Sequence, residues 1–210
     1  TWATESVHSR LRDQVRRTVG PDAHVVGAVS GGVDSTVAAA LLREAIGPRF
    51  HGVLVDNGLL RAGEADEVRE RLGVACVDAS DRFMSALAGV ADPETKRKRI
   101  GALFVEVLEE EADRLGREHP VELLLQGTLY PDAVESTTLK THHNVRGLPD
   151  TMRLKLVEPL RELYKDEVRA LGARLGLSHT ARWRHPLPGP GLAVREPGER
   201  TRRDCDTPRR

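Results

Sequence analysis

The stretch His24-Val-Val-Gly-Ala-Val-Ser-Gly-Gly-Val-Asp-Ser-Thr36 decides the fold class of this 210-residue chain. Its first seven residues form an apolar run bounded by Pro21-Asp22 and Gly31-Gly32, which predicts a buried strand. An Ala- and Leu-rich segment from Val33 to Ala45 follows directly and ends at Gly47-Pro48, which predicts a helix with a clear C-terminal stop. A buried strand, a glycine turn and a helix in this order are typical of an open α/β sheet.

The same alternation continues along the chain. Apolar runs predict further strands over residues 51–56, 74–77, 121–125 and 154–157. Amphipathic segments between and before them predict helices over residues 1–19, 64–72, 94–115 and 165–175. Apolar strands that alternate with helices favour an α/β fold, with a parallel sheet of about five strands and helices on both faces.

The last 15 residues, Glu196 to Arg210, differ in kind from the rest of the chain. They carry five arginines and four acidic residues, and Cys205 is their only apolar side chain, which predicts a disordered tail. We therefore expect one folded domain over residues 1–195 and a polar tail over residues 196–210. The chain begins at Thr1 rather than at Met, as a fragment or a processed product does.

Composition excludes several classes of function. The 32 basic and 32 acidic residues cancel, which argues against a protein that binds nucleic acid through bulk charge. There is no apolar run of the ~20 residues that a membrane span requires, and no signal-peptide pattern, so we expect a cytoplasmic protein that does not bind membranes. Cys76 lies in a predicted apolar strand and Cys205 in the tail, so neither a disulfide framework nor a cysteine-based zinc site is expected.

The segment from Ser30 to Thr36 carries the strongest functional signal. It places a glycine turn at a helix N-terminus and at the carboxyl edge of the sheet, where open α/β folds bind their ligands. We expect Gly31 and Gly32 to adopt positive φ, and the free N–H groups with the helix dipole to favour phosphate. The hydroxyls of Ser30, Ser35 and Thr36 add possible donors. The segment is neither a Walker A loop nor a dinucleotide-binding fingerprint.

Asp34 lies inside this loop. A carboxylate beside a phosphate group repels it unless Mg²⁺ bridges the two, so the loop predicts a magnesium–nucleotide complex with Asp34 as the metal ligand. The alternative is a glycine turn capped by serine and aspartate side chains, with no ligand.

The loop resembles the pyrophosphate loop of the N-type ATP pyrophosphatases. Further strings are similar to the ATP-pyrophosphatase domain of the GMP synthetase family and occur in the family's order between Trp2 and Arg195: Val55-Asp-Asn-Gly-Leu-Leu-Arg61, Asp92-Pro-Glu-Thr-Lys-Arg-Lys98, Gln126-Gly-Thr-Leu-Tyr-Pro-Asp-Ala-Val-Glu-Ser136, Lys140-Thr-His-His-Asn144, Val157-Glu-Pro-Leu-Arg161, Lys165-Asp-Glu-Val-Arg169 and Arg184-His-Pro-Leu-Pro-Gly-Pro-Gly-Leu-Ala-Val-Arg195. The last string is the most specific of them.

The resemblance implies an adenine nucleotide alpha-hydrolase-like fold and a reaction. ATP would adenylate the 2-oxo group of xanthosine 5′-monophosphate (XMP), and ammonia would then displace AMP to give GMP. It also implies that Mg²⁺ accompanies ATP, and that a separate glutamine amidotransferase subunit supplies ammonia. A homodimer is expected if a dimerisation domain, which the family normally carries after the Arg184–Arg195 string, is present in the full chain.

The resemblance also implies roles for individual residues. The catalytic residues would be Asp34 and Lys140, with Lys140 offsetting charge on the departing pyrophosphate. Residues expected to bind ATP or pyrophosphate are Ser30, Gly31, Gly32, Val33, Asp34, Ser35, Thr36, Val55 and Asn57. Residues expected to bind XMP are Arg97, Gly127, Thr128, Asp132, Glu135, Pro188, Gly189, Pro190 and Gly191.

Several alternatives remain open. Asp132 and Glu135 are candidates for a second pair of metal ligands or for helix caps. The neighbours of Arg97 in Lys96-Arg-Lys-Arg99 are expected to form a solvated basic face. His142-His143 does not predict a metal site, because adjacent side chains in an extended segment point to opposite sides. Two other functions compete: another ATP pyrophosphatase such as an NAD synthetase, or an inactive or regulatory ATP-binding module.

Overall fold

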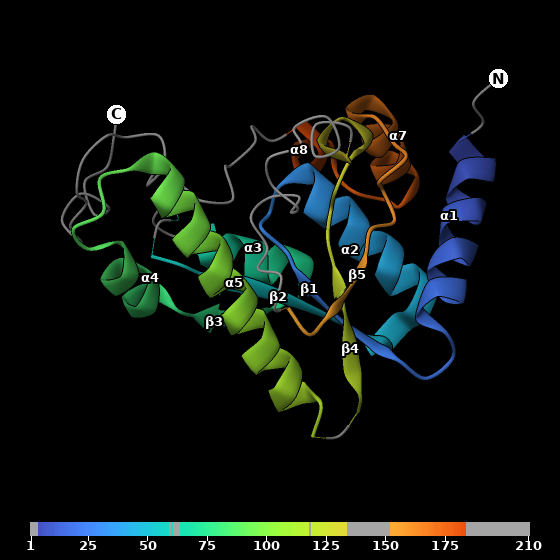
Figure 1. Cartoon of the computed structure of the whole chain (residues 1–210). Helices are drawn as coiled ribbons and strands as arrows, with labels where there is room; N and C mark the ends of the chain where they lie inside the picture. The colour runs from blue at the N-terminus through green and yellow to red at the C-terminus, as the bar shows by residue number, and fades with distance from the viewer. Residues whose placement is uncertain (1–3, 59, 61–63, 118, 134–151, 184–210) are drawn as a thin grey trace.

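Five parallel strands form one sheet in the order β3-β2-β1-β4-β5 (Figure 1). The computed structural model describes residues 4–58, 60, 64–117, 119–133 and 152–183. The strands are β1 (His24–Ala28), β2 (Phe50–Asp56), β3 (Ala75–Asp78), β4 (Val121–Leu125) and β5 (Lys155–Val157). The parallel α/β fold expected from the sequence is confirmed.

The order of the strands positions the site. The chain builds β1 first, proceeds to one edge through β2 and β3, and then returns to the other side of β1 with β4 and β5. The carboxyl ends of β1 and β4 therefore lie side by side, at the point where the strand order reverses. Such a switch point is where open α/β sheets bind ligands.

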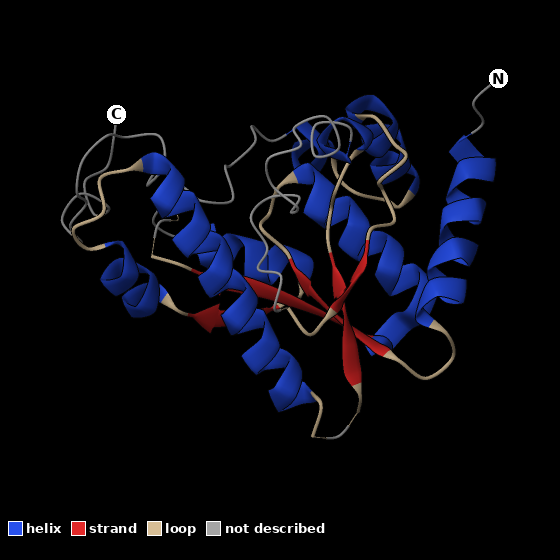
Figure 2. Ribbon diagram, in the orientation of Figure 1, coloured by secondary structure: helices blue, strands red, loops and turns tan. Residues whose placement is uncertain are grey.

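Helices cover both faces of the sheet (Figure 2). One face packs against α1 (Thr4–Val19), α2 (Val33–Ile46), α3 (Glu64–Leu72) and α7 (Lys165–Arg174). The other packs against α4 (Ser80–Leu87) and α5 (Pro93–Leu115). A single turn, η1 (Gly47–Arg49), precedes β2, and the short α8 (His179–Trp183) follows α7.

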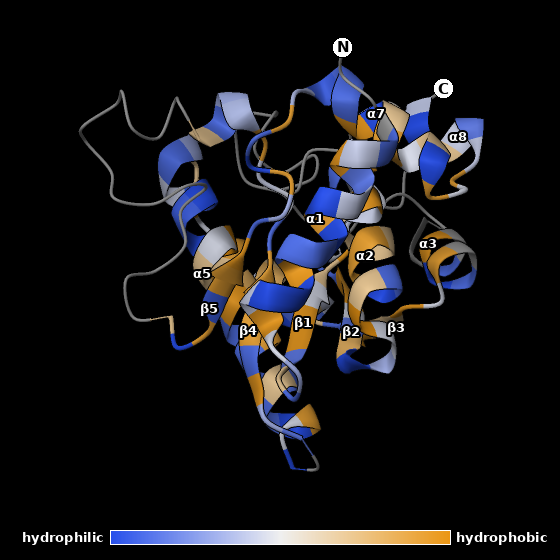
Figure 3. Cartoon of the chain, turned by 90° about the vertical axis from the view of Figure 1, so that its right-hand side faces the viewer, coloured by the Kyte–Doolittle hydropathy of each residue, from blue (hydrophilic) through white to orange (hydrophobic). Residues whose placement is uncertain are grey.

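The two cores explain why these segments form these elements. Leu11, Val15 and Val19 repeat every four residues on α1 and are all at most 5% exposed, so that one stripe of the helix is buried. Along β1 the side chains alternate between the two cores, with Val25 in one and Val26 in the other. Figure 3 shows the resulting concentration of hydrophobic residues on the central strands and on α2.

Most element boundaries agree with the sequence-based predictions to within a few residues. The helix predicted from residue 94 begins at Pro93, because the Asp92 carboxylate caps it by accepting the Thr95 N–H at 2.7 Å. The short helices α4 and α8 were not predicted. None of the helices within the described ranges is long and apolar enough to cross a membrane. The division of the chain at residue 195 and the polar tail lie outside the described residues.

Strand β3 is less buried than its apolar sequence suggests. It is the edge strand of the sheet, and Cys76 on it is exposed. Partial desolvation, followed by the nearby Asp56 carboxylate, raises the pKa of the Cys76 thiol. A raised pKa keeps the thiol protonated at neutral pH.

Candidate functional site

The loop after β1 forms a tight turn into α2. Gly31 has a φ of 75°, in the left-handed region that favours glycine. Gly32 is the N-cap of α2, with φ −69° and ψ 155°, an extended conformation that any residue adopts. The expectation of positive φ was therefore right for Gly31 and wrong for Gly32. No side chain of the loop caps the α2 N-terminus, so the first N–H groups of the helix keep their capacity for an anion.

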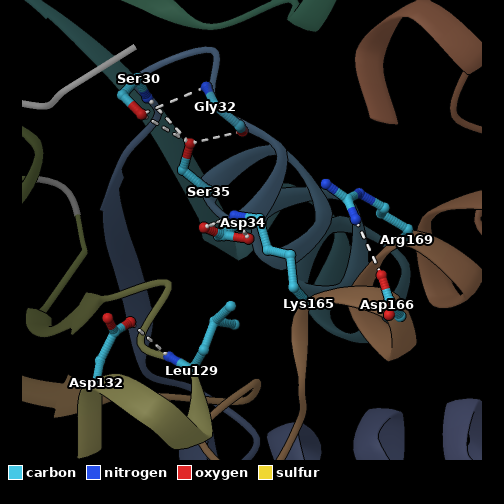
Figure 4. A network of polar contacts seen from close by, with 9 residues as sticks. All are labelled: Ser30, Gly32, Asp34, Ser35, Leu129, Asp132, Lys165, Asp166 and Arg169. Carbon is cyan, nitrogen blue, oxygen red and sulfur yellow. Dashed lines mark hydrogen bonds and ion pairs between the residues drawn. The ribbon is translucent and has the colours of Figure 1, made fainter. Parts of the chain in front are cut away.

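The serine hydroxyls of the loop bond to the loop itself (Figure 4). Ser35 Oγ donates to the Gly32 carbonyl at 3.1 Å and accepts the Ser30 N–H at 3.2 Å. The Ser30 and Ser35 hydroxyls are also 3.1 Å apart. Thr36 is 1% exposed, and its Oγ1 has no hydrogen-bond partner in the described part of the chain. The two serine hydroxyls thus fix the shape of the turn. The Val33 side chain packs into the core.

Asp34 forms an ion pair with Lys165, 131 positions away in the sequence (Figure 4). Lys165 Nζ lies 2.6 Å from Oδ2 and 2.8 Å from Oδ1, so it contacts both carboxylate oxygens. The Asp34 side chain is 22% exposed and the Lys165 side chain 39%. The contact joins the first turn of α2 to the first residue of α7 at the carboxyl edge of the sheet.

Sequence analysis assigned no role to Lys165, although its string was part of the resemblance. Two signals could have identified it. The chain has only five lysines, and this one begins a helix soon after a predicted strand, on the same edge of the sheet as the loop. The contact itself is a tertiary one that no local pattern encodes.

The turn after β4 packs directly against this loop. A Cβ at Gly127 would lie 3.2 Å from both the Asp34 carbonyl carbon and the Ser35 nitrogen. Glycine at position 127 therefore allows the backbone of this turn to approach the N-terminus of α2. Gln126 donates its N–H to the Val157 carbonyl, and its side-chain Oε1 is buried without a hydrogen-bond partner among the described residues.

Thr128 and Asp132 make contacts within the protein. Thr128 is fully buried, and its hydroxyl donates to Glu158 Oε1 at 2.6 Å; Glu158 also pairs with Arg161 at 2.6 Å. The Asp132 carboxylate accepts the Leu129 N–H at 3.1 Å, as a cap of the helical turn that begins at residue 130. Of the two roles considered for Asp132, the structure displays the helix cap.

The segment after β2 ends at the same carboxyl edge. Val55 is 5% exposed and packs in the core, so only its backbone is available at that edge. Asn57 is 1% exposed. Gly58 follows with a φ of 71° and donates its N–H to Asp56 Oδ1 at 2.9 Å, which is a local turn.

The basic segment at the start of α5 is not uniformly solvated. Arg97 is exposed, but Lys96 is only 3% exposed, so the expectation of a solvated face was wrong for Lys96. Arg99 donates to the Ala86 carbonyl, and Lys98 pairs with Glu94. The remaining predicted site residues, Glu135, Lys140 and the Pro188–Gly191 string, lie outside the described residues, as does His142-His143.

The donor set at Asp34 fits a hard divalent cation shared with a ligand. The carboxylate already holds a cation, the Lys165 ammonium, so the position favours positive charge. Among the described residues, no group of three or more His, Cys, Asp and Glu side chains is arranged to hold a metal ion. A Mg²⁺ ion bound here would therefore need phosphate and water oxygens as further ligands, which is how it usually binds with nucleotides.

Comparison with known proteins identifies the relatives of this chain. It is 54% identical over 225 aligned residues to the GMP synthase [glutamine-hydrolyzing] of Eremothecium gossypii, and 55% identical over 213 to that of Schizosaccharomyces pombe. These alignments cover 100% and 94% of this chain. The chain is homologous to one segment of the GMP synthases. It spans 43% and 40% of the length of these two relatives. No family model matches the chain.

Two solved structures with the same fold are synthetases of NMN and of NAD. The NMN synthetase of Francisella tularensis superposes with a TM-score of 0.70, at 16% identity, over 91% of this chain and 78% of that one. The NH3-dependent NAD synthetase of Campylobacter jejuni gives 0.64 at 15% identity, over 85% and 76%. These likenesses confirm the fold expected for the chain, while the similarity to the GMP synthases is one of sequence.

Proposed function

We propose that this chain binds magnesium–ATP at the carboxyl edge of its sheet and is the ATP-pyrophosphatase part of a GMP synthase. The observation that carries the proposal is the turn at residues 30–36. It combines a glycine in the left-handed region, an uncapped helix N-terminus and a carboxylate that already attracts a cation. Sequence identity above 50% with GMP synthases supports XMP as the second substrate.

The proposed chemistry has two steps. The 2-oxo oxygen of XMP attacks the α-phosphorus of ATP, and pyrophosphate leaves. Ammonia then adds to purine C2, the carbon that carries this oxygen. AMP leaves with the oxygen, and the aminated product loses a proton to give GMP. The N–H groups at the start of α2 would hold the phosphates of ATP. Asp34 would hold Mg²⁺, which supplies positive charge to the triphosphate, and Lys140 would stabilise the charge that develops on pyrophosphate.

The remaining residue assignments belong to the same proposal. Arg97 would meet the XMP phosphate, and the turn from Gly127 to Asp132, with Glu135 and the Pro188–Gly191 string, would line the XMP site. Asn57 would lie beside the adenosine. We further propose that a separate glutamine amidotransferase subunit supplies the ammonia, that the full protein forms a homodimer if it carries a dimerisation domain, and that it is cytoplasmic.

One assay tests the function and separates it from its rivals. The chain is supplied with ATP, Mg²⁺, ammonium and either XMP or deamido-NAD, and AMP, GMP and NAD are measured by chromatography. We expect AMP and GMP with XMP and no product with deamido-NAD. Formation of NAD would favour the NAD synthetase function. ATP binding without turnover of either substrate would favour the inactive or regulatory ATP-binding module.

A further inference from the structure

The contact between Lys165 and Asp34 conflicts with the proposed role of Asp34 as a metal ligand. Lys165 Nζ lies within hydrogen-bond distance of both carboxylate oxygens. A divalent cation bound to either oxygen would lie within a few ångströms of the ammonium, where like charges repel strongly because the site is half-buried. The ammonium and the cation therefore cannot share the carboxylate in this geometry.

The position of Lys165 in its helix is itself unfavourable. It is the first residue of α7, where the helix dipole favours negative charge, and the two residues that follow it, Asp166 and Glu167, are acidic. Glu167 accepts the Tyr164 N–H at 2.7 Å in the usual manner of an acidic residue near a helix N-terminus. Helix stability therefore does not account for a lysine at position 165.

The backbone beneath Lys165 is fixed, so any change at this contact is confined to the side chain. The Leu163 carbonyl accepts the Tyr130 N–H at 3.0 Å, and the Leu163 side chain is 2% exposed. A Cβ at Gly172 would lie 2.9 Å from Val37 Cγ2, which shows how closely α7 packs on α2. The lysine side chain is 39% exposed and can rotate away from Asp34 without moving α7.

We propose that Lys165 is a placeholder cation that makes metal binding at Asp34 conditional on nucleotide. Without a nucleotide, the ammonium occupies the carboxylate and competes with free divalent cations. A metal–nucleotide complex displaces the ammonium at a lower free-energy cost than a free divalent cation does, because the phosphates of the nucleotide offer the released ammonium a new partner. The inference rests on the proposed function, since it requires Asp34 to be the metal ligand.

The test uses the whole 210-residue chain and Mn²⁺ as the probe. Mn²⁺ affinity is measured by water-proton relaxation, without nucleotide and with saturating ATP, for the parent, Lys165→Met and Lys165→Arg. We expect Lys165→Met to bind Mn²⁺ alone at least fivefold more tightly than the parent, and ATP to raise its Mn²⁺ affinity by a smaller factor. Lys165→Arg keeps the charge and should resemble the parent. Lys155→Met removes an exposed lysine of β5 and is the matched control.

Failure of this inference can be distinguished from failure of the proposed function. If Lys165→Met binds Mn²⁺ alone no more tightly than the parent, Lys165 is not a placeholder. If Asp34→Ala leaves the affinity for magnesium–ATP unchanged, Asp34 is not the metal ligand, and the proposed placeholder role of Lys165 is then wrong as well. A lower melting temperature of Lys165→Met with weaker binding of both probes would assign the contact a purely structural role and overturn the proposal.

Discussion

The two edges of the sheet are built in opposite ways. At the amino edge, where β1, β2 and β4 begin, polar side chains satisfy one another. His24 Nδ1 lies 2.8 Å from His51 Nε2, and the His119 ring stacks on His24 with centroids 4.4 Å apart. Arg49 donates to the carbonyls of Gly20 and Ala23 at 2.8 and 3.1 Å. The polar side chains named here therefore find their partners within the protein.

The carboxyl edge leaves polar capacity unused. Thr36 Oγ1 and Gln126 Oε1 are buried there without hydrogen-bond partners in the described part of the chain, and the N-terminus of α2 has no side-chain cap. Buried polar atoms without partners are costly, and they are retained where a ligand or water completes them. Substitutions at the carboxyl edge should therefore alter ligand binding more than stability, whereas those at the amino edge should do the reverse.

The largest effect is expected from Lys140. Replacing it by alanine removes the charge proposed to stabilise the departing pyrophosphate, so turnover of XMP to GMP should fall by about 10²-fold or more. The melting temperature should change little. Steady-state kinetics and a thermal melt measure the two quantities, with Lys155→Ala as the control. A normal adenylation rate for Lys140→Ala would remove Lys140 from the site.

Asp34→Ala should have the next largest effect. Loss of a charged partner is worth roughly 1.5–3 kcal/mol, so the affinity for magnesium–ATP should fall by about 10- to 100-fold. The fold should survive, because the Asp34 side chain is partly exposed and its ion pair stabilises the protein by at most about 1 kcal/mol. Titration calorimetry with and without Mg²⁺ gives the comparison. If this variant lost stability but kept its affinity for magnesium–ATP, the assignment of the carboxyl edge to ligand binding rather than to stability would be contradicted.

Gly32→Ala and Gly127→Ala form a matched pair. A Cβ at Gly32 would meet only Ser30 Oγ, at 3.4 Å, and its backbone conformation suits alanine. We expect unchanged stability with several-fold weaker ATP binding, because the methyl group would occupy the space beside the helix N-terminus. A Cβ at Gly127 would press on the backbone of Asp34 and Ser35 at 3.2 Å and should also cost about 1–3 kcal/mol of stability. If Gly32→Ala bound ATP with the affinity of the parent, the phosphates of ATP would not lie beside the N-terminus of α2.

Local patterns predicted much of this molecule, and tertiary contacts account for what they missed. The apolar run of β1 and the glycine turn before α2 are local signals, and the structure has both of them. The buried Lys96 and the Lys165–Asp34 pair were not predictable, because each depends on packing between elements distant in sequence. The φ of Gly32 also departed from expectation: Gly31 alone takes the left-handed conformation that the turn needs.

The smallest expected effect is at the amino edge and depends on pH. Partial burial is the main cause of the lowered pKa of both His24 and His51, and the charge of His119 contributes to both. His51 and Arg49 lower the pKa of His24 further, while Arg114 lowers and Glu111 raises that of His51. Because both values fall below 6.5 in the folded state, the unfolded chain binds more protons near that pH. The stability due to this cluster should be complete above pH 6.5 and decline as the pH falls below it.

The variant His51→Gln tests this expectation, because it removes one titrating ring and one partner of His24. Melting temperatures measured between about pH 5 and pH 8 should decline less steeply toward acid for His51→Gln than for the parent. His179→Gln changes an exposed histidine outside the sheet and should keep the parent's slope. Magnesium–ATP affinity at neutral pH should be the same in all three proteins, since the amino edge lies at the opposite end of the strands from the loop. Equal slopes in the parent and His51→Gln would mean that the histidine contacts add no pH-dependent stability. A loss of ATP affinity in His51→Gln would mean that the two edges are coupled through the sheet.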